Sequence, residues 1–316
     1  MCKSPTVGSW TPAARRHRCL QNRPQRLQLQ RCADRLRERL AVAARISACE
    51  KSGEWRMALH LLSKMPTGRV VPDVISFNAG ISACEKGGEL QMSLSLFSHM
   101  QTVEVLPSDR SFNAATSACE KSGEWRMALH FLSQMPSARL VPNEITFSAC
   151  ISACEKDGEW QKALQLLAQM PAARSIPNVI TFSASISACG AGGAWRMAVH
   201  ILSQMPTARV LANEVSFNSA INACEQAGVW HAALHLLAQM STIRLLPNHR
   251  SFNAGMMACE KGGEWQLALQ LLSQMPTARV LPNEISFNAG IGACEKGSEW
   301  QKALFLLCIQ MPAARV

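Results

Sequence analysis

Cysteine is the residue type in this 316-residue chain with the widest chemical scope, since it could form disulfides, bind metal or act as a nucleophile. Eight of the 13 cysteines form one column at intervals of 35 residues: Cys49, Cys84, Cys119, Cys154, Cys189, Cys224, Cys259 and Cys294. Each occupies the same place in its own copy, so the spacing does not pair them, and free cysteine is commonly a small buried hydrophobe. We therefore interpret the column as core packing in a reducing compartment.

Other arrangements of reactive residues are incomplete. Cys150 and Cys154 share a helix face one turn apart and could begin a metal site, but no nearby His or second Cys pair completes it. A zinc deaminase needs H-x-E followed by P-C-x-x-C, and a metallonuclease needs clustered carboxylates; the sequence has neither. Four histidines share a column off the apolar stripe, which favours a solvated helix face: His60, His130, His200 and His235. We predict no enzyme activity, no metal and no cofactor.

The columns belong to one repeated unit. Residues 285–296 read ISFNAGIGACEK, and the phenylalanine of this stretch recurs every 35 residues without insertion or deletion, at Phe287, Phe252, Phe217, Phe182, Phe147, Phe112 and Phe77. Only the tail of the motif recurs at residues 46–55, so we count an eighth, degenerate copy; the copies start near residues 39, 74, 109, 144, 179, 214, 249 and 284. So regular a period predicts a solenoid, in which each unit buries its apolar face against the next.

Each copy is predicted to fold as two helices. In the last copy, apolar residues spaced i, i+4, i+7 place a first helix at about 285–296. In the copy before it, Gly263 is expected to end the first helix, Glu264 to open the second and Pro276 to close it. The tryptophans lie in the apolar stripe of the second helix, so we interpret them as inter-helix core. The predicted fold class is all-α.

The basic charge is concentrated at the start of the chain. Residues 1–38 carry +7 of the net charge of +10, and the first acidic residue is Asp34. An Arg-rich leader without a long apolar region is typical of an organelle transit peptide, although a basic capping helix at 31–45 or a misplaced gene start also fits. We divide the chain into this leader, 1–38, and a repeat domain, 39–316. The expected location is the mitochondrion or chloroplast, otherwise the cytoplasm.

The 35-residue helix-turn-helix unit, with a (V/I)-(S/T)-F-N head and an L-x-P-(N/D) tail, resembles the pentatricopeptide repeat family over residues 39–316. The tetratricopeptide repeat has a period of about 34 residues and a W-x-x-L-G-x-x-Y head, which is absent here. The chain departs from the plant-like consensus by having Phe where Tyr is common and by its Cys-Glu-Lys tail. The resemblance implies a right-handed superhelix whose first helices line a groove for single-stranded RNA, with one base per repeat.

We count each repeat from the residue after its Pro-Asn or Pro-Asp, so that Glu284 is a first residue. The resemblance implies that the fifth and last residues of a repeat read the base edge, as Asn78 with Ser108, Asn113 with Asn143, Ser148 with Asn178, Ser183 with Asn213, Asn218 with Asn248, Asn253 with Asn283, and Asn288 without a partner. It implies that the second residue packs against the base, namely Ile75, Arg110, Ile145, Ile180, Val215, Arg250 and Ile285. It places near the RNA backbone the lysine column of Lys51, Lys86, Lys121, Lys156, Lys261 and Lys296, which is interrupted at Ala191 and Gln226.

Similar pairs in the family imply the order C, pyrimidine, A, A, pyrimidine, pyrimidine from the second to the seventh repeat, because Asn presents an amide to a pyrimidine and Ser leaves room for a two-ring base. The implied partner is single-stranded RNA in organellar RNA processing, stability or editing, with no membrane and no small-molecule substrate. Two alternatives stay open. The polar columns could be a solvated face copied by duplication, or the concave face could be a scaffold for protein partners.

The lysine column predicts salt-dependent RNA binding. The slope of log affinity against log salt should be about −0.7 for each phosphate that the lysines engage, because each neutralised phosphate releases counterions. A titration of the chain with single-stranded RNA at several salt concentrations measures this slope. A slope near zero would count against the lysines as backbone contacts.

Overall fold

The computed structural model describes residues 41–67, 72–306 and 308. All regular structure in these residues is helical, and none of their helices is long and apolar enough to cross a membrane. The leader at 1–38 lies outside the described residues, so its interpretation stays a prediction.

The helices alternate as the repeat predicts. Residues 41–52 are helical, and the first helices of the following repeats are α4 (Val74–Lys86), α6 (Asp109–Ser122), α8 (Glu144–Lys156), α10 (Val179–Ala191), α12 (Glu214–Gln226), α14 (His249–Gly262) and α16 (Glu284–Lys296). The second helices are α3 (Trp55–Thr67), α5 (Leu90–Thr102), α7 (Trp125–Gln134), α9 (Trp160–Gln169), α11 (Trp195–Gln204), α13 (Trp230–Thr242), α15 (Trp265–Thr277) and α17 (Trp300–Phe305).

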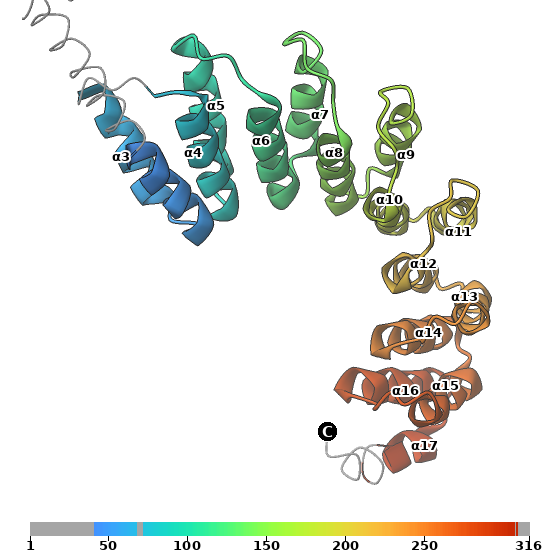
Figure 1. Ribbon diagram of the computed structural model, residues 1–316. Coiled ribbons are helices and arrows are strands. Elements are labelled where there is room, and N and C mark those ends of the chain that lie inside the picture. The colour runs from blue at the N-terminus through green and yellow to red at the C-terminus, as the bar shows by residue number, and fades with distance from the viewer. Residues whose placement is uncertain (1–40, 68–71, 307, 309–316) are drawn as a thin grey trace, which may run out of the picture. The chain divides into compact units, whose positions relative to one another are not determined.

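The chain forms two compact units, Met1–Leu106 and Pro107–Val316. In the first unit, α4 packs against both α3 and α5. In the second, each first helix packs against the first helix of the next repeat and against the second helix of its own. Figure 1 shows α10, α12, α14 and α16 side by side on the inner side of this unit, with α11, α13 and α15 outside them. The predicted all-α solenoid of stacked helix pairs is confirmed.

A side-chain cap fixes where each first helix begins. The Asn143 side chain accepts a hydrogen bond from the backbone N–H of Thr146 at 3.0 Å, and the Thr146 hydroxyl accepts one from the backbone N–H of Asn143 at 3.4 Å. This reciprocal arrangement satisfies two of the donors that a helix start leaves without an intrahelical partner. Ser108, Asn178, Asn248 and Asn283 cap their helices in the same way. The helix therefore starts directly after the capping residue, which confirms the predicted start to within one residue.

The end of the first helix matches the prediction, and the second helix differs from it in two details. Gly263 has a φ of 75° and closes α14, because glycine adopts this left-handed conformation without steric cost. Glu264 is the N-cap of α15 rather than its first residue, and its side chain makes no capping hydrogen bond. The expected stop at Pro276 is wrong, since α15 includes this proline and ends at Thr277. In the last turn, the proline removes only one donor and the helix is ending anyway.

The cysteine column belongs to the core. All its members except the half-buried Cys49 are buried, and every cysteine of the described residues is a free thiol. Burial raises the pKa of Cys84 and Cys189 to about 11 and that of Cys119 to about 12, because a thiolate would lose its hydration there. These thiols stay protonated at neutral pH and act as small apolar side chains, as we predicted.

The tryptophans pack between consecutive repeats. A Cβ built on Gly262 would lie 2.3 Å from Cδ1 of Trp230 in the repeat before, and one on Gly297 would lie 2.2 Å from Cδ1 of Trp265. These side chains are half-buried rather than fully buried, and Trp300 of the last repeat is 64% exposed. The predicted core role therefore holds in a modified form: the indole of one repeat covers the end of the next first helix, where a glycine allows close approach.

We predict that Gly262→Ala destabilises the chain by about 1 kcal/mol, because the overpacking cost against the Trp230 ring exceeds the helix propensity that alanine adds. In a Trp230→Ala background the same change should stabilise by up to about 1 kcal/mol, since the ring is gone. Urea unfolding of the four proteins in this double-mutant cycle measures both values. Equal effects in the two backgrounds would show that the ring does not require the glycine.

Candidate nucleic-acid interface

The predicted base-reading residues occupy two structural positions. The fifth residues lie on the first helices, and the last residues are the N-caps of the following first helices. Asn78, Ser183 and Asn253 are buried at 5%, 7% and 6% exposure, and Asn288 is exposed. Asn78 lies in the first unit and Ser108 in the second, whereas the other five pairs lie within the second unit.

In the second unit, the two members of a pair meet at a hydroxyl that sequence reasoning missed. The Thr146 hydroxyl lies 2.8 Å from Oδ1 of Asn113 and 2.9 Å from Oδ1 of Asn143. Thr146 is the third residue of its repeat, so one side chain both caps its own helix and holds the fifth residue of the repeat before. The sequence signals the capping part of this arrangement as Asn-x-x-Ser or Asn-x-x-Thr at the start of the fourth to eighth repeats.

The same arrangement recurs in three further repeats. The distances from the central hydroxyl to the fifth and last residues are 2.9 and 3.1 Å for Ser216 with Ser183 and Asn213, 2.6 and 3.2 Å for Ser251 with Asn218 and Asn248, and 2.6 and 2.9 Å for Ser286 with Asn253 and Asn283. In the last of these, Nδ2 of Asn253 also donates directly to Oδ1 of Asn283 at 3.3 Å. The structure therefore brings four of the predicted pairs together.

The pair of Ser148 with Asn178 is arranged differently. The Ser148 hydroxyl donates to the backbone carbonyl of Glu144 at 2.7 Å, and the Asn178 amide donates to the Glu144 carboxylate. A glutamate at the first place of the repeat therefore lies beside this pair. Glu214 does the same for Asn248, whose Nδ2 lies 3.2 Å from Oε2 of the carboxylate. We did not predict a role for these glutamates.

The capping bonds determine which atoms of the paired asparagines remain available. In Asn143, Oδ1 accepts the backbone N–H of Thr146, so that the N–H₂ group is the part that can face a ligand. In Asn113, Oδ1 accepts the Thr146 hydroxyl, which again leaves the N–H₂ group. The pair of Asn113 with Asn143 therefore presents hydrogen-bond donors. Its complement is an acceptor-rich edge.

The residues at the second place form an exposed column. The aliphatic members are more than half exposed, at 63% for Ile75, 59% for Ile145, 63% for Ile180, 58% for Val215 and 55% for Ile285. Arg110 and Arg250 are also exposed. In the second unit, exposed β-branched side chains in four repeats form an apolar surface, which is typical of a binding site.

The lysine column forms ion pairs with glutamates of the repeat before. Nζ of Lys261 lies 2.6 Å from Oε1 of Glu225, and Nζ of Lys296 lies 3.1 Å from Oε1 of Glu260. Lys156 instead donates to the backbone carbonyl of Lys121. In these two ion pairs, a lysine at the thirteenth place neutralises a glutamate 36 residues before it. The lysines therefore carry a structural role in addition to any contact with RNA.

This ladder of ion pairs is broken in the fifth repeat. The place opposite Glu155 is occupied by Ala191, and the place opposite Gln226 is occupied by Gly190. Burial raises the pKa of Glu155 above its usual value, although a hydrogen bond with Ser187 and the charge of Lys156 oppose the shift. The ionised carboxylate of Glu155 is therefore less stable in the folded chain than in water.

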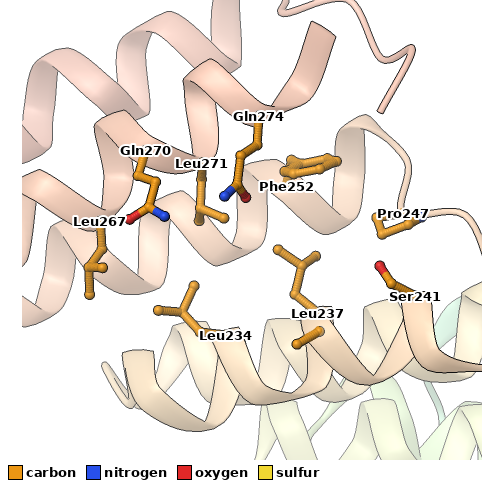
Figure 2. Close-up of a pocket in the computed structure, with 10 residues that line it drawn as sticks. Leu234, Leu237, Ser241, Pro247, Phe252, Leu267, Gln270, Leu271 and Gln274 are labelled. Atoms are coloured by element: carbon orange, nitrogen blue, oxygen red, sulfur yellow. The ribbon is translucent and has the colours of Figure 1, made fainter. Parts of the chain in front are cut away.

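A pocket away from these columns is apolar. Figure 2 shows Leu234 and Leu237 facing Phe252, Leu267 and Leu271, with Gln270, Gln274 and Ser241 at its margin. Its volume is about 260 Å³, and no acidic or basic side chain lines it. In the described part of the chain, no three His, Cys, Asp or Glu side chains gather as they would around a metal ion.

Family profiles of known proteins match the region that contains the observed repeats. The profile of the PPR repeat family matches residues 142–191, and that of the PPR repeat matches residues 44–70, 75–104, 110–140 and 215–244. These ranges together exceed half of the chain. A comparison with curated proteins found no match.

Among solved structures, the maize pentatricopeptide repeat protein PPR10 has a TM-score of 0.64 and 23% identity, over 86% of this chain and 44% of that one. PPR10 in complex with an 18-nt psaJ RNA element has a TM-score of 0.50 and 19% identity, over 82% of this chain and 42% of that one. These likenesses establish the shared fold. The chain spans less than half the length of the PPR10 chains that it matches.

We predict that Ala191→Lys stabilises the chain by about 0.5–1 kcal/mol at pH 7, because the new ammonium would pair with the unneutralised Glu155. The gain should vanish as the pH falls through the pKa of Glu155, since the protonated carboxyl offers no charge. Gln226→Lys is the matched control: it also ends a first helix, but Gly190 provides no carboxylate. Urea unfolding at neutral and acidic pH measures both variants. Equal gains from the two changes would refute the pairing.

Proposed function

We propose, from the premise that this chain belongs to the pentatricopeptide repeat family, that it binds single-stranded RNA sequence-selectively along the inner row of first helices. The observation that supports this most directly is the convergence of the fifth and last residues on one hydroxyl in four repeats. In each of these repeats the fifth and last residues meet at one point beside the exposed apolar column of second-place residues. Such a site fits one flat group that has polar atoms along its edge. Because the arrangement recurs at the repeat spacing in four repeats, the complementary ligand is a polymer with one such group per unit.

The available atoms favour particular bases. At the asparagine pairs, such as Asn113 with Asn143, amide N–H groups would donate to the acceptor oxygens and nitrogen of a pyrimidine edge. At Ser183 the shorter side chain, whose hydroxyl is held by Ser216, leaves more room and suits a purine. These features support the proposed order C, pyrimidine, A, A, pyrimidine, pyrimidine. The asparagine pairs do not separate C from U, because both carry an acceptor O2.

The exposed column at the second place would hold each base between two neighbouring repeats. Ile145 and Ile180 offer apolar surface to the faces of a base, and the guanidinium plane of Arg250 can stack on a base as well. Stacking on such surfaces accepts any base, so it contributes affinity. Selectivity is left to the paired polar residues beneath.

The setting of this activity is also a proposal. We infer a non-catalytic role in the processing, stability or editing of an organellar transcript, which rests on the basic leader at 1–38 and on the family. The solved relative PPR10 was crystallised with an RNA element, and this supports RNA as the ligand class. The match covers 42% of the PPR10 chain, so the proposal concerns RNA binding by the repeats only.

A binding titration with two RNAs tests the reading. The full chain should bind an RNA containing CUAAUU more tightly than one containing CUCCUU, by roughly thirtyfold, since two wrong bases at about 1 kcal/mol of hydrogen bonding each cost about 2 kcal/mol in total. Changing Ser148 and Ser183 to Asn should reverse the preference, because both repeats would then present asparagine pairs.

Asn78→Gln with Asn253→Gln serves as the matched double substitution outside the two central repeats, and it should lower affinity for both RNAs alike. Equal binding of the unaltered chain to both RNAs would leave RNA binding without the proposed selectivity. No binding to either RNA would overturn the proposed function and bring protein partners forward.

A further inference from the structure

Among the described residues, five arginines form a second regular column, which we call the arginine track: Arg139, Arg174, Arg209, Arg244 and Arg279. Each is exposed and lies in the turn between a second helix and the following first helix. All five have a left-handed backbone, with φ between 58° and 62°. The track lies entirely within the second unit.

The backbone at this turn does not favour arginine. The N–H of Arg139 bonds to the carbonyl of Pro136 at 2.9 Å, and the N–H of Leu140 bonds to that of Met135 at 2.9 Å. These two backbone hydrogen bonds together form the Schellman motif, whose left-handed residue is most often glycine. A side chain at such a position costs roughly 1 kcal/mol. The same chain uses glycine in the left-handed turn after seven of its first helices, so arginine here is retained against a steric cost.

The neighbouring residues vary while the arginine stays. The residue after it is Leu140, Ser175, Val210, Leu245 or Val280 in the five repeats. In the first unit the same turn carries Glu104, also with a left-handed backbone at φ 56°. Among the described residues, positive charge at this place therefore occurs in the repeats from the third to the seventh. It is not required by the turn.

The track provides uncompensated positive charge along the loop edge of the second unit. Within the described residues none of the five guanidinium groups has an ion-pair partner, whereas Lys261 and Lys296 are paired with glutamates. Exposed aliphatic side chains stand two residues after each arginine, at 67% for Val141, 78% for Ile176, 85% for Leu211, 76% for Leu246 and 83% for Leu281. The loop edge thus alternates cationic and apolar groups.

One groove joins the track to the base-reading residues. Arg279 lines it together with Asn248 and Asn283, and Leu246 and Leu281 form its apolar sides. Its volume is about 870 Å³. Glu214 also lines it, but this carboxylate accepts the amide of Asn248 and is directed to that side chain. A chain whose bases meet the asparagines therefore passes within the same groove as a free guanidinium.

We propose that the arginine track is a second phosphate-binding row, in which one arginine per repeat holds the backbone of the bound RNA at the loop edge of the groove. This rests on the proposed RNA binding and adds the residues that grip the backbone. Guanidinium binds phosphate through paired N–H donors, and the apolar side chains beside it exclude water and strengthen the contact. The track provides one arginine per repeat, which matches the one base per repeat proposed for the base-reading pairs.

The test replaces three arginines of the track in the full chain, as Arg174→Gly, Arg209→Gly and Arg244→Gly together. Glycine suits the left-handed backbone, so the melting temperature should stay the same or rise, which separates binding from folding. We expect affinity for the CUAAUU RNA to fall about tenfold or more, and the log-log salt slope to become shallower by roughly 2, at about 0.7 for each lost phosphate contact. The preference over CUCCUU should not change, because phosphate contacts carry no sequence information.

The matched control removes three charges from the second helices, as Arg126→Gln, Lys162→Gln and Arg196→Gln, and should change affinity less than about twofold, since the net charge alone acts weakly at moderate salt. If the unaltered chain binds selectively and the glycine variant keeps the same affinity and salt slope, phosphate binding by the arginine track is refuted. The proposed function would then still stand. Loss of the base preference in the glycine variant would also overturn it, because the arginines would then read bases. If the unaltered chain binds neither RNA, both proposals fall.

Discussion

The first helix of a repeat depends on one hydrogen bond. The backbone N–H of the third residue of the repeat donates it to the side-chain oxygen of the N-cap, which is the last residue of the repeat before. In the fourth repeat it joins Thr146 to Asn143 at 3.0 Å. It satisfies a donor that the helix cannot satisfy itself, and it sets the residue at which the helix begins. Because the helical period is fixed, this start also determines which side chains face the neighbouring first helix. The Asn143 oxygen used for capping is then closed to a ligand, so the donor character of this amide follows from how the helix starts.

Charge is distributed unevenly over the second unit although the net charge of the repeats is small. At the carboxyl ends of the first helices, glutamates and lysines of successive repeats neutralise one another, as in Glu225 with Lys261. At the other ends, the turns carry arginines without ion-pair partners in the described residues. A count of lysines and arginines would treat these groups as equal. A polyanion can bind an unpaired arginine directly, whereas it must first displace a carboxylate to bind a paired lysine.

The features set by local periodicity were predictable from the sequence, and the features set by contacts between repeats were not. The two helices, the glycine that ends the first and the buried cysteine column follow from residue patterns within one repeat. The half-burial of Trp230 against Gly262, 32 residues later, was missed because both lie in different repeats. Hydroxyls such as that of Thr146 were missed as well, since a capping residue gives no local sign of its contact with Asn113.

The sequence by itself determined the 35-residue unit, its strict register, its two amphipathic helices and its family, because backbone hydrogen bonding over four residues and the burial of one apolar stripe suffice for these. The tertiary structure decided which polar atoms remain available. Whether an amide, a lysine or an arginine is free depends on side chains about one repeat away in the chain but adjacent in space. Such pairings arise from how closely consecutive first helices approach, and this distance is set by packing between repeats rather than by any pattern within one.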